Sequence, residues 1–139
     1  MEPRAKGVLE SSLYVDDLRA AAKFYGQFLG LEEVLREEGR HLFYRCGAGM
    51  LLLFLPDASC HPSHVRQQLI PPHGAHGPGH LAFRVDHDEI ASWRQRLAEA
   101  QIPIESEVRW PNGARSLYFR DPAGNSIELA TPDLWGIVD

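Results

Sequence analysis

One histidine and two glutamates, residue types that commonly bind metals, occupy predicted strand positions in this sequence. Glu128 lies between Ile127 and Leu129, in an apolar run near the C-terminus. A buried carboxylate is costly unless a cation, a proton or hydrogen bonds compensate its charge. Together, Glu10, His80 and Glu128 form a ligand set suited to a divalent ion such as Mn²⁺, Fe²⁺, Zn²⁺, Ni²⁺ or Mg²⁺. The residue types therefore predict a metal centre, provided that the fold brings them together.

The elements that must position these residues occur twice. The segment HLFYRCGAGMLLLF (41–54) aligns without a gap with SLYFRDPAGNSIEL (116–129), at an offset of 75. Upstream, residues 9–18 resemble residues 79–90 at an offset of 70. Each copy has an alternating strand, then a helical pattern, then a hairpin signal. We therefore predict two copies of a strand–helix–strand–strand–strand module.

Side chains alternate between the two faces of a strand, and this sorts the candidate ligands. Glu10 and Tyr14 share the polar face of the first strand, and His80 takes the corresponding place in the second copy. Glu128 projects opposite to its apolar neighbours, and the ungapped alignment pairs it with Leu53. Two modules related by a rough twofold axis bring equivalent positions together, so three donors and one apolar residue are expected to converge.

A helix is expected after the first strand of each copy. Residues 18–29 and 90–100 carry apolar side chains at spacings of three and four residues. Asp16 or Asp17 is expected to cap the first helix, and Asp88 the second. The apolar faces of the strands should lie under these helices, which leaves the candidate ligands on the opposite face.

The whole chain of 139 residues fits one compact domain. We place the first module at about 7–56, a Pro- and Gly-rich linker or lid at 57–78, and the second module at about 79–133. An apolar tail, 134–139, completes the chain. A single module is short of core, so the two modules should share one.

Composition excludes several classes of partner. The net charge of -5 and the scattered Lys and Arg residues argue against nucleic acid. No apolar run reaches membrane-spanning length, and the first residues lack the pattern of a signal peptide, so we expect no membrane partner and a cytoplasmic location. The two cysteines, Cys46 and Cys60, are expected to be reduced thiols.

Simpler interpretations of the candidate ligands remain open. His80 can be a strand histidine hydrogen-bonded to a neighbour. Glu128 can face solvent or pair with Arg84 or Arg120, and Glu10 can simply be exposed. These readings need no metal.

Further histidines gather in the Pro- and Gly-rich segment. The sequences CHPSH (60–64) and HGAHGPGH (73–80) contain several possible ligands, but metal binding needs a held geometry. A lid role for His73 or His76 is more consistent with this composition.

The sequence is similar to the vicinal oxygen chelate superfamily, which includes glyoxalase, extradiol dioxygenases and bleomycin-resistance binding proteins. LYVDDLRAAAKFYGQFLGL, GPGHLAFRVD and YFRDPAGNSIEL carry the resemblance, which extends over residues 7–133. It implies an α+β fold in which two paired βαβββ modules form an open, cup-shaped mixed sheet with helices on the outside. It also implies Glu10, His80 and Glu128 as metal ligands, with Leu53 where four-ligand members have an acid.

The resemblance implies a glyoxalase- or dioxygenase-like metalloenzyme. Its substrate would be a small molecule that chelates one divalent ion through adjacent oxygens, in a lyase, isomerase or dioxygenase reaction. Glu128 and Glu10 are the candidate catalytic residues. Strand alternation adds candidates for substrate binding, which are Tyr14, Arg84, Tyr118 and Arg120.

A metal-free protein of the bleomycin-resistance type is the alternative. Such a protein would bind a drug or other small molecule, and Leu53 in the fourth position favours it. The presence of His80 with Glu128 argues against it. A homodimer is expected from the resemblance alone.

Overall fold

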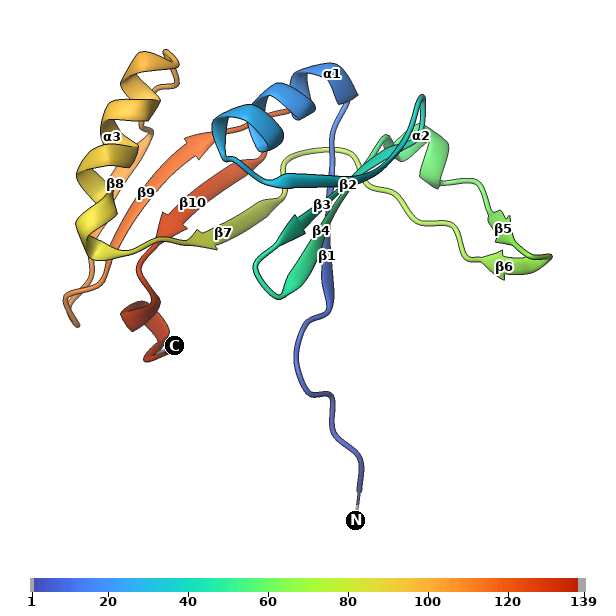
Figure 1. Ribbon diagram of the computed structural model, residues 1–139, viewed down its shortest axis with the longest axis horizontal. Coiled ribbons are helices and arrows are strands. Elements are labelled where there is room, and N and C mark those ends of the chain that lie inside the picture. The colour runs from blue at the N-terminus through green and yellow to red at the C-terminus, as the bar shows by residue number, and fades with distance from the viewer. Residues whose placement is uncertain (1, 138–139) are drawn as a thin grey trace. The chain divides into compact units, whose positions relative to one another are not determined.

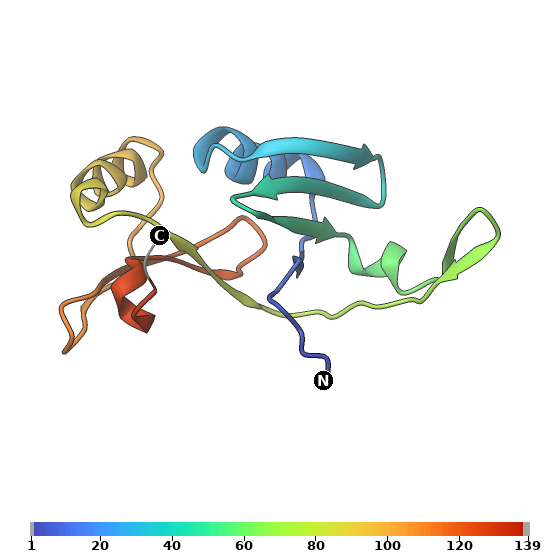
Figure 2. The same ribbon diagram turned by 60° about the horizontal axis from the view of Figure 1, so that its bottom comes forward.

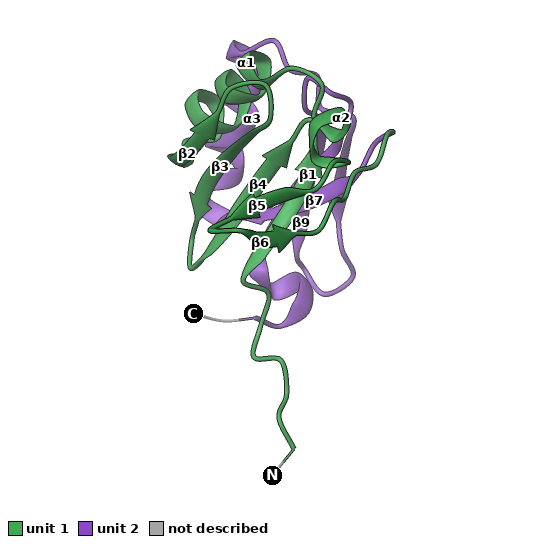
Figure 3. Ribbon diagram, turned by 90° about the vertical axis from the view of Figure 1, so that its right-hand side faces the viewer, with its two compact units in different colours: residues 1–76 green, residues 77–139 purple. Residues whose placement is uncertain are grey.

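The computed structural model describes residues 2–137 of the chain (Figure 1). The chain divides into two compact units, residues 1–76 and 77–139 (Figure 3). Each unit contains a four-stranded mixed sheet and the helix that follows its first strand. The predicted α+β class with two βαβββ modules is confirmed. The joint cup is a property of both units together and stays a prediction.

In the first unit, β1 runs parallel to β4, and the other neighbouring strands are antiparallel, in the order β1-β4-β3-β2. A separate two-stranded hairpin, β5-β6, follows the short helix α2. The elements are β1 (Glu10–Tyr14), α1 (Leu18–Ala21), η1 (Ala22–Phe28), β2 (Glu32–Glu37), β3 (His41–Cys46), β4 (Gly49–Phe54), α2 (Pro56–Ser59), β5 (Ser63–Val65) and β6 (Gln68–Ile70).

The second unit repeats this topology in the order β7-β10-β9-β8, with β7 parallel to β10. Its long helix α3 lies along one side of the sheet (Figure 2) and buries Ile90 and Leu97. The elements are β7 (His80–Arg84), η2 (His87–Glu89), α3 (Ile90–Glu99), β8 (Ser106–Arg109), β9 (Arg115–Arg120), β10 (Ser126–Ala130) and η3 (Pro132–Trp135).

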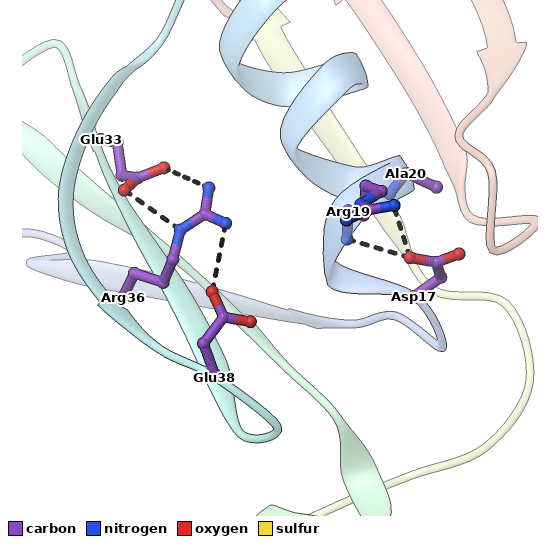
Figure 4. A network of polar contacts seen from close by, with 6 residues as sticks. All are labelled: Asp17, Arg19, Ala20, Glu33, Arg36 and Glu38. Carbon is purple, nitrogen blue, oxygen red and sulfur yellow. Dashed lines mark hydrogen bonds and ion pairs between the residues drawn. The ribbon is translucent and has the colours of Figure 1, made fainter.

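The first helix begins where the sequence predicts. Asp17 Oδ1 accepts hydrogen bonds from the backbone N–H groups of Arg19 and Ala20, at 2.9 and 3.1 Å (Figure 4). Such a side-chain cap satisfies donors that have no partner within the helix. The helix then widens, because the Leu29 N–H bonds to the Phe24 carbonyl five residues earlier. The expected single α-helix over 18–29 is thus α1 followed by the π-helical η1.

The second helix begins differently from the prediction. Asp86, not Asp88, provides the cap: its side chain accepts from the Glu89 backbone, and its own N–H bonds to Glu89 Oε1 at 2.9 Å. This is a capping box. A 3₁₀ turn over 87–89 precedes α3, so the cap falls two residues before the predicted position.

Charged side chains cover the outer strand β2. Arg36 pairs with Glu33 at 2.7 Å and with Glu38 at 3.5 Å (Figure 4). The hydrogen bond from Arg36 is the main cause of the lowered pKa of Glu33. Exposed pairs of this kind contribute little stability, but charges along a sheet edge discourage pairing with a further strand.

The strand registers show how the two modules correspond. Met50 pairs with Glu10 in the first unit, whereas Ser126 pairs with His80 in the second. From Met50 to Ser126 the offset is 76, so β4 and β10 do not correspond at the predicted offset of 75. Glu10 and His80 remain equivalent, at the predicted offset of 70.

A longer turn causes this shift of one residue. Residues 121–125 connect the second hairpin, whereas only residues 46–49 span the same distance in the first. The equivalent of Glu128 is therefore Leu52, and the predicted pairing with Leu53 was wrong. The physical conclusion survives, since the fourth position is still apolar.

The segment predicted as a linker or lid contains ordered structure. It includes the end of α2 and the β5-β6 hairpin. The backbone of His73 is held at two points by Ser59, whose carbonyl accepts from the His73 N–H at 2.9 Å and whose hydroxyl donates to the His73 carbonyl at 2.6 Å. Both cysteines are free, as expected. Within residues 2–137, none of the helices has the length and apolar character needed to cross a membrane.

Candidate functional site

One face of the sheet in the second unit carries all five residues predicted for that unit. Paired residues on neighbouring strands project to the same side of a sheet. Ser126 pairs with both His80 and Arg120, Glu128 pairs with Tyr118, and Ala130 pairs with Arg84. The face predicted from alternation is therefore confirmed for His80, Arg84, Tyr118, Arg120 and Glu128.

Glu128 is buried at the centre of this face, with only 5% of its surface exposed. The Ser116 hydroxyl donates a hydrogen bond to Glu128 Oε2 at 2.6 Å. On the other side, His80 Nε2 lies 3.3 Å from Glu128 Oε1. The Ser116 hydrogen bond compensates part of the cost of burying the carboxylate, and the second contact is with the predicted histidine.

The orientation of His80 is fixed by the backbone. Its Nδ1 lies 3.0 Å from the Ser126 carbonyl oxygen, which can only accept, so Nδ1 must carry a proton. In the neutral ring, Nε2 then presents a lone pair toward Glu128 Oε1. Two acceptors at this distance repel each other unless a proton or a cation lies between them.

The chemistry of this pair fits a divalent ion. A neutral imidazole whose Nδ1–H bonds to a backbone carbonyl is the usual form of a metal-bound histidine. Ligand atoms about 2.1 Å from one shared ion are separated by roughly 3.0–3.5 Å at ordinary bond angles. The 3.3 Å between Nε2 and Oε1 falls in this range. The side chain of His80 is also 52% exposed, which leaves it accessible.

Tyr118 lies beside the pair. Its ring stacks on the His80 ring, with centroids 6.3 Å apart and planes inclined by 21°. Burial raises the pKa of the Tyr118 phenol, and the charge and hydrogen bond of Glu128 raise it further. Tyr118 is therefore a neutral hydrogen-bond donor at physiological pH.

Ser116 and Trp110 are parts of the site that the sequence analysis did not assign. The Trp110 indole N–H donates to Ser116 Oγ at 2.9 Å. Strand alternation contained a signal for Ser116, because it stands two residues before Tyr118 and shares its face. No local pattern indicated the bond from Trp110.

The two arginines of this face differ in their surroundings. Arg120 donates two hydrogen bonds to the carboxylate of Glu105, at 2.9 and 3.1 Å, and a third to the Gly124 carbonyl. A substrate anion would therefore compete with Glu105 for this guanidinium. Arg84 is exposed at the C-terminal end of β7.

The first unit contains the remaining two predicted residues, Glu10 and Tyr14. Glu10 is exposed at the start of β1. Tyr14 Oη lies 2.7 Å from His73 Nδ1, and the Phe54 ring packs against both, edge-on to His73 at 4.5 Å. His41 and Phe43 stack next to Phe54. The corresponding face of this unit is thus aromatic.

The structure therefore brings together two of the three predicted ligands, His80 and Glu128. Glu10 belongs to the other unit. Among residues 2–137, no three His, Cys, Asp or Glu side chains stand close enough to form a complete metal site.

Comparison with known proteins identifies the family to which this chain is similar. A family model described as the Glyoxalase/Bleomycin resistance protein/Dioxygenase superfamily matches residues 7–129. A crystal structure of lactoylglutathione lyase from Agrobacterium tumefaciens is 44% identical, covers 97% of this chain and all of that chain, and has a TM-score of 0.89. The fosfomycin resistance protein FosX from Mesorhizobium loti is 18% identical with a TM-score of 0.64, which shows a shared fold alone.

Among curated proteins, a metallothiol transferase FosB from Staphylococcus epidermidis is 38% identical over 61 residues. The match covers 43% of this chain and 43% of that protein. A similar match, 34% identical, is found to FosB from Staphylococcus saprophyticus. The chain thus matches less than half the length of these curated relatives.

Proposed function

Because the chain belongs to the Glyoxalase/Bleomycin resistance protein/Dioxygenase superfamily, we propose that it is a metal-dependent enzyme acting on a small molecule through adjacent oxygens. The observation that carries this proposal is the His80–Glu128 pair, in which Nε2 of a ring held at Nδ1 by a backbone carbonyl lies 3.3 Å from a buried carboxylate oxygen. A divalent ion shared by these two residues removes the repulsion between them. In this position a divalent ion supplies Lewis acidity toward a carbonyl or enolate oxygen.

Each candidate residue has its own role in this proposal. His80 Nε2 and Glu128 Oε1 are ligands, and Glu10 is the third. With so few protein ligands, coordination positions remain for two oxygens of one substrate. Glu10 is also the proposed proton acceptor. Tyr118 would line the substrate side of the His80–Glu128 pair, and Arg84 would attract an anionic group.

Metal analysis tests the proposal. We expect protein purified without added ions to contain close to one equivalent of a divalent metal, and H80A and E128A to lose it. E99Q, which changes an exposed glutamate on α3, is the matched control and should keep the metal. A wild-type chain without metal that binds a cationic aromatic drug tightly would instead support the metal-free alternative.

The names of two relatives suggest a narrower substrate class. Lactoylglutathione lyase and metallothiol transferase both refer to thiol compounds. We therefore propose that the substrate is a small oxygen-bearing molecule that is joined to a thiol compound or reacts with one. Lactoylglutathione should raise the unfolding temperature of the metal-loaded chain more than glutathione or lactate alone. Equal and negligible shifts for all three would exclude this substrate class.

We also propose that the protein is a cytoplasmic homodimer. The β5-β6 hairpin extends from the sheet of its own unit (Figures 1 and 2), and it exposes Val65, Leu69 and Ile70. Val65 and Leu69 are each 58% exposed, which favours burial against another chain. Sedimentation of the wild type and of a V65D/L69D double variant tests this. A dimer that the double variant retains would place the interface elsewhere.

A further inference from the structure

We infer that Trp110 and Ser116 are positioning residues, which orient the Glu128 carboxylate through a hydrogen-bonded relay so that Oε1 is presented beside His80. Neither residue is a proposed ligand. The inference rests on the proposed metal-dependent function and adds to it the groups that fix the geometry of one ligand.

The direction of the relay follows from hydrogen-bonding chemistry. An indole N–H can only donate, so Trp110 occupies a lone pair of Ser116 Oγ. The single hydroxyl hydrogen of Ser116 is then free to point at Glu128 Oε2, where the O···O distance is 2.6 Å. A distance this short is typical of a hydroxyl bonded to an ionised carboxylate. The relay therefore fixes which atom donates at each step, from Trp110 through Ser116 to Glu128 Oε2.

The relay also selects which oxygen of Glu128 is available. Oε2 is occupied by Ser116, and Ser116 itself is fully buried, so water does not replace it. Oε1 is the oxygen that faces His80 Nε2. With Oε2 bonded to Ser116, Oε1 is the oxygen that would be available to an ion shared with His80.

A rigid turn places Trp110 at the start of this relay. Its backbone N–H donates to the Ala114 carbonyl at 2.8 Å, and its own carbonyl accepts from Gly113 at 2.9 Å. Gly113 has a φ of 91°, a conformation that glycine adopts without strain. Asn112 ties the turn to η3 by donating to the Asp133 carbonyl at 3.1 Å. These hydrogen bonds to backbone groups thus hold Trp110 in place at the start of the relay.

Titration of the full chain with Mn²⁺ alone tests the relay. Loss of a group that orients a ligand typically weakens metal binding about 10- to 100-fold. We expect a loss in this range for S116A, a smaller loss for W110F and recovery of affinity in S116T. The matched controls S92A, on the exposed face of α3, and W135F, at a tryptophan that is 78% exposed, should bind as the wild type does. Thermal unfolding identifies any variant that fails to fold.

A second readout needs no metal. The indole ¹H–¹⁵N resonance of Trp110 should shift in S116A and in E128L, while those of Trp93 and Trp135 stay in place. If the Trp110 resonance is unchanged in S116A, the relay does not exist. If the wild type binds Mn²⁺ and both S116A and W110F bind it equally well, the relay does not position Glu128. If the wild type binds no Mn²⁺, the proposed function fails, and the indole resonances alone decide the relay.

Discussion

The two units have the same topology, yet the equivalent faces of their sheets differ in chemistry. In the first unit, Tyr14, Phe54 and His73 form an aromatic cluster. In the second, Ser116, Glu128 and His80 form a polar network around a buried carboxylate. The strand order and the pairing of the first and last strands are the same in both.

Individual equivalent positions make the contrast clear. Leu52 stands where the second unit has Glu128, and His41 stands where it has Ser116. A backbone that accepts either set imposes the positions of side chains but not their chemistry. One half of the duplication therefore supplies the partners that a buried carboxylate needs, whereas the other half supplies an aromatic cluster.

The largest effect is expected when a carboxylate is placed at Leu52, the position in the first unit that is equivalent to Glu128. Leu52 is 8% exposed, and no serine occupies the position that corresponds to Ser116. We therefore expect L52E to lower the free energy of unfolding by roughly 3 kcal/mol, because the new carboxylate is buried without the serine hydroxyl that bonds Glu128. Urea denaturation measures this. Unchanged stability would show that this face accepts a charge as readily as the second unit does.

The reverse exchange should separate stability from metal binding. E128L replaces a buried charge by an apolar side chain, as in the first unit. We expect metal binding to be lost and the free energy of unfolding to fall by only about 1–3 kcal/mol, because the buried Ser116 hydroxyl loses its acceptor. Metal content and urea denaturation of the same preparation provide both values. A large loss of stability would mean that Glu128 is mainly a structural residue.

The Tyr14–His73 hydrogen bond offers a smaller test of the aromatic face. Y14F removes only the hydroxyl that lies 2.7 Å from His73 Nδ1. The expected loss is about 1 kcal/mol, the usual net contribution of a hydrogen bond. Metal affinity should not change. An effect of Y14F on Mn²⁺ binding equal to that of S116A would remove the distinction between the two faces.

The smallest expected effects are changes with pH. In the first unit, they concern the stability associated with His41. Burial lowers the pKa of His41 below its ordinary value in the unfolded chain, so folding favours the neutral ring. The stability associated with this histidine is present above a pH of about 6.5 and is lost as the pH falls through the lowered pKa. H41F should flatten the stability profile below that pH. A profile as steep as that of the wild type would assign the pH dependence to another group.

On the other face, Tyr118 should respond to Glu128. The charge of Glu128 contributes to the raised pKa of this phenol, so E128Q should lower that pKa toward its ordinary value. Ultraviolet absorbance of tyrosinate against pH measures the change, with Y118F to identify the signal. A pKa that does not move in E128Q would mean that burial alone raises it.

The sequence predicted the faces of the strands better than their exact register. Alternation correctly grouped His80, Tyr118 and Glu128, because side-chain direction depends only on local backbone geometry. The ungapped alignment missed the extra residue in the 121–125 turn, since a turn can lengthen without altering the pattern of the strands that it connects.

Other parts of the site depended on tertiary structure. The bond between Trp110 and Ser116 crosses the β8–β9 hairpin and has no periodic signature in the sequence. His73 lies 59 residues from Tyr14, and the link between them exists because Ser59 holds the backbone at His73. Residue types thus indicated the chemistry, whereas long-range contacts determined which residues assist it.

We propose that His80 and Glu128 hold one divalent ion between them. The most direct measurement is the ¹⁵N chemical shift of His80 Nε2 during titration with Zn²⁺. The claim predicts a change that is complete at one equivalent, is confined to Nε2 of this ring, and disappears in E128L. A His80 signal that stays constant while one equivalent of Zn²⁺ binds elsewhere would contradict it.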